Sequence, residues 1–567
     1  MVENFISNSK KFFTKPQFSI LSAAWTIMVL VIASRILGLI RQRILAHFFL
    51  PSELSLFFAA FRLPDLIFEV FVFGTFSSAF IPVFTKALNK GRKEAWEVAS
   101  SVTNIGLIIF LIVGALIFIF AGHFYNFLAP GFSPAETQKI AFLTRVLFIA
   151  QGIFIISYVL TAVLESLRLF LVPALAPLFY NLGIIGGTYF LAPRLGLLGP
   201  AIGVLIGACL HLLIQLPLAL KMGFKFKLGI RLTAGVKKIG RLALPRLIEV
   251  SFLQVSKTVE LFLASLISAS SYTYFTFGNS LQALPIGLFG TSIAKAALPT
   301  LSRLAGSINS FKKVLFTSLY QIVFLVLPIA AILIVLRIPL VRLLFGTDIF
   351  KWGDTLETGW VVSAFALGVA FQSASAVLVR GFYALHDTKT PVTISVITII
   401  LVIVSDFVLI KYFGLPVWGL ALSSSLGSLL SFIILYKSML SKLEVENFWE
   451  SLKPVFKSLL ASFVSGIVMY FLLKIFDRSV WVKRLSFLSG IEATKYIPFE
   501  RFVLDTRYTI NLLILTGLVC LAGIVVYIVT SIVLKSREIW YFADLIKKIL
   551  ANRKILKIPP QEPEVLT

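Results

Sequence analysis

The chain has 567 residues, 58% of them hydrophobic, and a mean hydropathy of +0.95. This composition excludes a soluble globular domain, because apolar runs of about 20 residues, each long enough to cross a bilayer, recur along nearly the whole length. The formal net charge is +26, which in a soluble protein would suggest binding to nucleic acid. Here the Lys and Arg residues lie mostly between the apolar runs, so they indicate membrane topology and contact with anionic lipid rather than nucleic acid.

The apolar runs predict an all-α polytopic membrane protein with about fourteen transmembrane helices. The first run is too long for a cleavable signal peptide, and no small-residue cleavage site follows it. Neither the two cysteines nor the four histidines show the spacing of a metal site or a disulfide framework. The predicted spans are 19–40, 54–85, 100–122, 142–165, 170–192, 197–220, 240–268, 272–300, 313–336, 358–385, 390–412, 416–437, 455–475 and 509–534.

The first span carries cations at its end, in the segment SRILGLIRQRILAHFF. Arg35 occurs while the apolar run continues, and Arg41 and Arg43 follow. A cation at the centre of a bilayer costs roughly 2.5–3.5 kcal/mol on insertion scales. Arg41 and Arg43 could extend to the interface instead. Arg35 is deeper, so we expect it to act on an anionic cargo or in gating.

The distribution of basic residues between the spans predicts the orientation. Basic residues are concentrated in the N-terminal arm, the 2–3 loop, the 6–7 loop and the C-terminal tail, which an even number of spans places on one side. The positive-inside rule makes that side cytosolic, so both termini are predicted to be cytosolic. The basic loop 476–508 is an exception, and long loops follow the rule less well.

A weak internal repeat relates two sets of six spans. Three pairs of matching positions follow the same order and are separated by nearly the same number of residues. Six is even, so the two halves enter the membrane in the same direction, and a substrate pathway is expected between such parallel repeats. The matching pairs are Pro82 with Pro299, Pro173 with Pro391, and Gly199 with Gly419.

The repeat predicts the domain boundaries. They are a basic N-terminal arm (1–18), an N-lobe of spans 1–6 (19–222), a C-lobe of spans 7–12 (223–440), two appended spans with an outer loop at 476–508 (441–535), and a basic tail (536–567). The tail alternates apolar and basic residues, which fits an amphipathic helix on the inner leaflet or an ordinary stop-transfer flank.

Several stretches resemble a known family. They are SRILGLIRQRILAHFF, FFAAFRLPDLIFEVFVFGTFSSAFIPVF, FLAPGF, VPALAPLFYN, QLPLAL and RGFYALHDTKTPV. Together they resemble the MurJ/MviN lipid II flippases of the multidrug/oligosaccharidyl-lipid/polysaccharide exporter superfamily. The resemblance implies two six-helix lobes around a V-shaped cavity, alternating access, and lipid II as cargo. Lipid II is an undecaprenyl-pyrophosphate that carries the peptidoglycan precursor.

The resemblance also implies a substrate site for the pyrophosphate. Arg35 and Arg41 match the family's S-R-x-L-G-x-x-R segment, whose arginines line the cavity, and guanidinium groups bind phosphate oxygens in a bidentate manner. Arg62 matches a family lysine, although it could instead pair with Asp65. Lys257 is a further candidate, although a pair with Glu260 within its own helix is the simpler interpretation.

Some family positions differ in this chain. Ser55 stands where the family often has an acid, and Phe68 and Glu69 replace a common arginine pair. Ser280 stands where the second lobe is expected to carry an arginine. The cargo site would therefore use other cations, or the cargo would differ.

Acidic residues within spans are candidates for coupling. Glu260 matches the family's acidic position in span 7, and Asp406 and Ser424 match positions that form a sodium site in some members. The amide position of that site is Val402 here, so one ligand would be missing. The alternative is that both acids are satisfied by neighbouring groups. No cofactor is predicted, and the driving force would be sodium or the membrane potential.

The sequence thus predicts a transporter and not an enzyme. We expect it in the bacterial cytoplasmic (inner) membrane, as a monomer that contacts anionic lipids and the cell-wall synthesis machinery. The alternatives are an exporter of another polyprenyl-linked glycan or superfamily substrate, and a lipid-binding relative without transport. A membrane glycosyltransferase or ligase is disfavoured, because the outer loops lack a recognisable acidic or histidine motif.

Overall fold

The structure is a computed structural model that describes residues 20–70, 80–227, 229, 231, 233–477 and 503–542. The predicted N-terminal arm (1–18), most of the outer loop and all of the tail beyond residue 542 lie outside this part of the chain. The described residues are almost entirely helical, and their one β-type pairing is an isolated bridge between Asp477 and Leu504. The prediction of an all-α membrane protein is confirmed.

Twelve helices among the described residues are long and apolar enough to cross a membrane. Long helices follow from the sequence because a bilayer offers no water, so each spanning segment must satisfy its backbone hydrogen bonds internally. The predicted spans outside these twelve are the first (19–40) and the second (54–85), and part of the second lies outside the described residues. The count of fourteen stays a prediction.

The chain divides into two compact units, and their boundary passes through helices α15 (Arg337–Phe345), α16 (Trp352–Ala384) and α18 (Trp418–Lys442). The lobe boundaries expected from the repeat stay a prediction. The other helices of the first unit are α2 (Ile20–Phe48), α3 (Pro51–Ala60), α4 (Arg62–Phe68), α5 (Ile81–Lys90), α6 (Arg92–Leu128), α7 (Pro134–Ser166), α8 (Leu171–Leu195), α9 (Leu198–Leu213), α10 (Leu216–Lys221), α11 (Ala234–Ile267), α12 (Ser271–Pro285), α17 (Lys389–Phe407) and the π-helix η4 (Val408–Tyr412).

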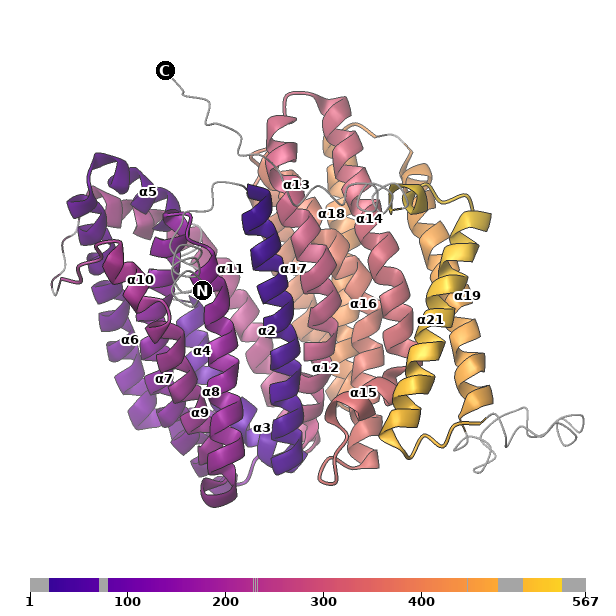
Figure 1. Ribbon diagram of the computed structural model, residues 1–567, viewed down its shortest axis with the longest axis horizontal. Coiled ribbons are helices and arrows are strands. Elements are labelled where there is room, and N and C mark those ends of the chain that lie inside the picture. The colour runs from indigo at the N-terminus through magenta and orange to yellow at the C-terminus, as the bar shows by residue number, and fades with distance from the viewer. Residues whose placement is uncertain are drawn as a thin grey trace, which may run out of the picture. The chain divides into compact units, whose positions relative to one another are not determined.

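In the first unit, α8 and α9 form a close antiparallel pair (Figure 1). Glycines allow this approach: a Cβ on Gly187 would lie 2.3 Å from the Cα of Gly203. A Cβ on Gly183 would lie 2.4 Å from the Cα of Gly207. Small residues at such spacing let membrane helices pack backbone against backbone. α2 packs against α8, so the close α8–α9 pair supports the position of α2.

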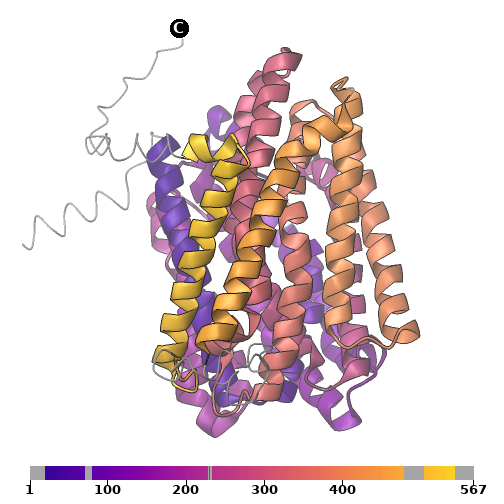
Figure 2. The ribbon, with the colours of Figure 1, turned by 90° about the vertical axis from the view of Figure 1, so that its right-hand side faces the viewer.

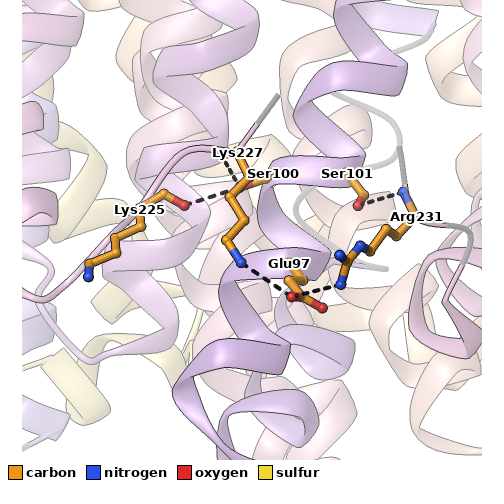
Figure 3. A network of polar contacts seen from close by, with 6 residues as sticks. All are labelled: Glu97, Ser100, Ser101, Lys225, Lys227 and Arg231. Carbon is orange, nitrogen blue, oxygen red and sulfur yellow. Dashed lines mark hydrogen bonds and ion pairs between the residues drawn. The ribbon is translucent and has the colours of Figure 1, made fainter. Parts of the chain in front are cut away.

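The linker from α10 to α11 is fixed to α6 by a polar network (Figure 3). Glu97 of α6 accepts from Lys227 at 3.4 Å and from Arg231 at 3.1 Å. Ser100 and Ser101 of α6 accept the backbone N–H groups of Lys227 and Arg231, each at 3.2 Å. These contacts connect the sixth predicted span to the seventh through one short, well-anchored segment.

The second unit contains the appended helices, and α19 and α21 lie side by side in it (Figure 2). Tyr527 of α21 donates its hydroxyl to the carbonyl of Phe324 at 2.8 Å. Ser465 of α19 donates to the carbonyl of Gly523 at 2.7 Å. Each bond satisfies polar groups that have no water to bind within a bilayer. Besides its parts of α15, α16 and α18, this unit contains η3 (Ile286–Thr291), α13 (Ser292–Arg303), α14 (Ile308–Val335), α19 (Phe448–Phe476) and α21 (Thr509–Val533).

Candidate functional site

A cavity of about 500 Å³ lies in the first unit between α2, α8, α12 and the end of α7. Three of the predicted substrate residues line it: Arg35, Arg41 and Ser280. Because α2 turns once every ~3.6 residues, side chains at spacings of three and four share one face. That face is directed at α8 and α12. The other polar lining residues are Ser34, Gln42, Glu165, Tyr180 and Asn181.

The two arginines of the cavity form no ion pair with an acid in the part of the chain that the structure describes. Arg35 is exposed and Arg41 is half-buried. Neither belongs to an ion pair among the described residues. A cation inside a span is normally paired or directed at a water-filled space. Two guanidinium groups that line the same cavity can therefore hold an anion with several oxygens, such as a diphosphate.

Ser280 occupies the cavity wall on α12 and links this helix to α2. Its Oγ lies 2.8 Å from Oε1 of Gln42 and 2.7 Å from the carbonyl of Phe277, and its hydroxyl donates to one of them. Gln42 is buried. Where the family pattern places a cation, this chain has a neutral hydrogen bond between helices. Sequence reasoning missed Gln42, which follows Arg41 directly and also lines the cavity.

Arg62 and Lys257 do not line this cavity. They belong to a separate network between α4 and α11. Arg62 donates to Oε1 of Gln254, and Gln254 donates to Oε2 of Glu69. Lys257 forms an ion pair with the same Glu69, with Nζ and Oε2 3.0 Å apart. The network connects a helix of the predicted N-lobe to a helix of the predicted C-lobe.

The local pairings considered from the sequence are therefore not the contacts of these side chains. Asp65 accepts a hydrogen bond from Nε2 of Gln151 at 2.6 Å instead of pairing directly with Arg62. Lys257 pairs with Glu69 of another helix rather than with Glu260 of its own. Glu69, which replaces a family arginine, thus supplies the negative charge that Lys257 requires.

The candidate cation-binding acids lie on two helices that pack together, α11 and α17. Asp406 is fully buried, and neither of its carboxylate oxygens accepts a hydrogen bond from a described residue. Glu260 lies within electrostatic reach of Asp406. Ser423 is the hydroxyl that contacts α17, donating to the carbonyl of Val402 at 3.0 Å. Ser424 is half-buried, and its carbonyl accepts from Ser428.

Close contacts join elements of the two predicted lobes near the C-terminal end of α2. Ser55 of α3 and Thr273 of α12 share a hydrogen bond of 3.0 Å, and Thr273 also donates to the carbonyl of Pro51 at 2.6 Å. A Cβ on Gly131 would lie 1.9 Å from the carbonyl oxygen of Ser265, so the loop before α7 meets the end of α11 without a gap. Ser55, where the family often has an acid, is thus part of a closed contact.

The same end is closed by the segment around α15. Arg43 donates from Nη1 to the carbonyl of Leu343 at 2.5 Å. Thr347 donates to the carbonyl of Ala46 at 2.8 Å. Arg43 therefore has a partner at this end, in contrast to Arg35 and Arg41. On α2, therefore, Arg43 belongs to a closed contact, whereas Arg35 and Arg41 line the cavity.

Solved structures with the same fold include a lipid II flippase MurJ in an inward closed conformation. The match has a TM-score of 0.73 at 24% identity and covers 93% of this chain and all of that one. A multidrug resistance MATE family transporter of the MOP superfamily, in an inward-facing conformation, matches with a TM-score of 0.60 at 15% identity, over 72% of this chain and 95% of that one. These likenesses show the fold.

Sequence comparisons are more specific. The probable lipid II flippase MurJ of Vibrio cholerae is 30% identical over 439 residues, which cover 74% of this chain and 83% of that protein. The lipid II flippase MurJ of Burkholderia cenocepacia is 26% identical over 427 residues, covering 73% and 82%. The family model for lipid II flippase MurJ matches residues 44–490. The resemblance seen in the motifs is confirmed, and the chain belongs to the lipid II flippase MurJ family.

Proposed function

We propose that this protein is a flippase that moves lipid II, the undecaprenyl-pyrophosphate-linked precursor of peptidoglycan, across the bacterial cytoplasmic membrane. The observation that carries the proposal is the pair Arg35 and Arg41, which line one cavity and form no ion pair with a described residue. A diphosphate supplies the anionic oxygens that two guanidinium forks can bind. Membership of the family supports this cargo.

Transport proceeds by alternating access between two openings. The contacts of Ser55, Thr273 and Arg43 keep the α2–α3 end closed. In the orientation that the positive-inside rule predicts, this closed end faces outward and both termini are cytosolic. The cargo would enter from the inner leaflet, and its head group would bind the arginines. Opening of the outward end then requires the hydrogen bonds at Ser55 and Thr347 to break.

The network of Arg62 and Lys257 supports a role as a lock on this state. It connects α4 to α11 through Gln254 and Glu69. A lobe rotation that separates these helices must break the ion pair between Lys257 and Glu69. A diphosphate that approaches Lys257 or Arg62 competes with Glu69 for the same donors. Both cations would then act in gating rather than as permanent parts of the binding cavity.

The driving force is proposed to combine the membrane potential with the acids Glu260 and Asp406. An inside-negative potential favours outward movement of an anion by about 2.3 kcal/mol per charge and per 100 mV. A buried carboxylate without hydrogen bonds is unfavourable as a bare anion. Asp406 therefore requires a proton or a hard cation such as sodium, which prefers oxygen ligands. Ser423 or Ser424 would add a hydroxyl oxygen.

A second candidate function is export of a different polyprenyl-linked glycan. The observation that favours it is Ser280, because the second lobe offers a neutral hydroxyl where a cation is expected. Neither candidate is an enzyme: both move a lipid without chemical change. Association with cell-wall synthesis proteins and a monomeric state belong to the same proposal.

Complementation distinguishes these candidates. The chain is expressed in a bacterium whose own lipid II flippase can be switched off, and its level in the membrane is measured. We expect growth with the parent chain and loss of growth with Arg35→Ala. Arg145→Ala is the matched control, because Arg145 is half-buried on α7, donates to the carbonyl of Phe118 and does not line the cavity. A parent chain that reaches the membrane but does not restore growth would overturn lipid II as cargo.

A further inference from the structure

A second cavity, of about 640 Å³, lies entirely within the second unit. Its walls are the first turns of α14, the first turns of α19 and the residues that follow α21. It shares no residue with the cavity of Arg35. Six lining residues are cations and two are acids, Glu450 and Glu538. The cations are Lys312, Lys313, Lys453, Lys457, Lys535 and Arg537.

The acids do not neutralise this cavity. Glu450 pairs with Lys453 at 3.2 Å, and both side chains are largely exposed. Glu538 is buried, at 5% exposure. Among the ion pairs of the described residues, none includes Lys312, Lys313, Lys535 or Arg537. We refer to these four residues as the free cations of the cavity.

The cavity is built on fixed helices. Tyr320 of α14 donates its hydroxyl to the carbonyl of Ser451 at 2.6 Å, which joins α14 to α19. Lys457 of α19 donates to the carbonyl of Lys535 at 3.2 Å, which joins α19 to the segment after α21. The rings of Phe316 and Tyr320 stack with centroids 6.1 Å apart and form an apolar part of the wall. The free cations therefore surround a preformed space.

The position of the cavity corresponds to the membrane interface. α14, α19 and α21 are each apolar enough to span a membrane. The cavity lies at the start of α14, at the start of α19 and just beyond the end of α21. Exposed aromatic residues mark this level: Trp449, Trp540 and Tyr541 are 72%, 60% and 48% exposed. Trp and Tyr are enriched at the depth of lipid head groups. A basic cavity at this depth faces the phosphates of the leaflet.

We propose that this cavity binds the phosphate head group of an anionic glycerophospholipid. Lys312, Lys313, Lys535 and Arg537 hold the phosphodiester. The acyl chains stay in the bilayer beside the exposed apolar residues of α19, such as Phe456 and Phe463. One bound lipid would connect α14, α19 and the segment after α21. It would therefore stabilise the second unit by linkage, because the folded state binds the lipid and the unfolded state does not.

The test measures the melting temperature of the full-length protein in a neutral detergent. Phosphatidylglycerol, phosphatidylcholine or sn-glycerol 3-phosphate is added over a range of concentrations. We expect a rise in melting temperature with phosphatidylglycerol alone. In Lys312→Gln/Arg537→Gln, the phosphatidylglycerol concentration for the half-maximal shift should rise about twentyfold, because each basic residue near a lipid surface contributes about 1 kcal/mol, or about fivefold. Lys237→Gln/Lys238→Gln, exposed on α11, is the matched control and should behave as the parent.

Each other outcome overturns the proposal. An equal shift with sn-glycerol 3-phosphate identifies a site for soluble phosphates. Equal weakening in the variant and the control shows attraction by total charge rather than by the cavity. The absence of a shift with phosphatidylglycerol excludes the site. If the double variant does not fold, Lys313→Gln replaces it, since Lys313 is exposed and its loss should weaken binding about fivefold.

Discussion

Two groups of cations within the first unit differ in how their charge is balanced. Arg35 and Arg41 line a cavity and form no ion pair with another described residue, whereas Arg62 and Lys257 are held by Gln254 and Glu69. Retaining an unpaired cation in a membrane span is unfavourable unless a ligand or water compensates for it. This difference distinguishes cations that are available to an anion from cations that join two helices.

The largest expected effect comes from removing both unpaired arginines. In Arg35→Ala/Arg41→Ala we expect lipid II flipping in vesicles to fall about a thousandfold, since truncating one partner of a desolvated charge pair costs about 2 kcal/mol or more. The melting temperature should not fall, because neither guanidinium forms an ion pair with a described residue. A large loss of stability would place these arginines with the structural cations instead.

Arg35→Lys tests whether geometry matters in addition to charge. Lysine retains the positive charge but cannot offer the two parallel N–H donors of a guanidinium group. We expect flipping about tenfold slower than in the parent, which corresponds to about 1.4 kcal/mol of lost binding. The same assay on Arg41→Lys shows whether both forks contact the cargo. Full activity in both variants would mean that the cavity recognises charge alone.

Glu69→Gln should affect stability and gating rather than cargo binding. It leaves Lys257 without its ion pair, although both side chains are partly exposed, at 35% and 45%, so the loss is about 1 kcal/mol. We expect a lower melting temperature and easier opening of the α4–α11 contact, measured by the distance between spin labels on these helices. The exchange Glu69→Lys/Lys257→Glu should recover part of the loss, because it restores the ion pair but not the hydrogen bond from Gln254 to Glu69. If it does not, the ion pair is not what closes the contact.

Ser280→Ala should have the smallest effect. It removes one hydrogen bond between α12 and α2, which is worth about 1 kcal/mol. Flipping should change less than fivefold, because Ser280 carries no charge for the diphosphate. A loss as large as that of the arginine variants would show that Ser280 contacts the cargo directly.

The sequence predicts the features that depend on local composition. Apolar runs predicted the helices, because a bilayer requires each run to form one, and the resemblance of the first span to the family segment predicted that Arg35 lines a cavity. Partners distant in the chain could not be predicted: Gln42 and Ser280 are separated by 238 residues, and Glu69 and Lys257 by 188. Local spacing favoured Glu260 as the partner of Lys257, but helix packing brought Glu69 closer.

Helix rotation explains a finer difference. Each residue turns an α-helix by ~100°, so neighbouring serines face different directions. The family pattern pointed to Ser424, whereas Ser423 is the residue whose hydroxyl reaches α17. A triple serine run offers no signal of which member faces the acid. Such a choice depends on the packing of α17 and α18, which a single sequence does not reveal.

The anchored linker between α10 and α11 has a consequence for limited proteolysis. Its basic side chains Lys225, Lys227 and Arg231 are potential trypsin sites, but the backbone at these positions is hydrogen-bonded to Ser100, Ser101 and Asn104 of α6. A protease needs a segment that can leave the surface and extend into its cleft. The linker should therefore resist cleavage in the folded protein, and Asn104→Ala, which removes two of these backbone hydrogen bonds, should turn it into an early cutting site.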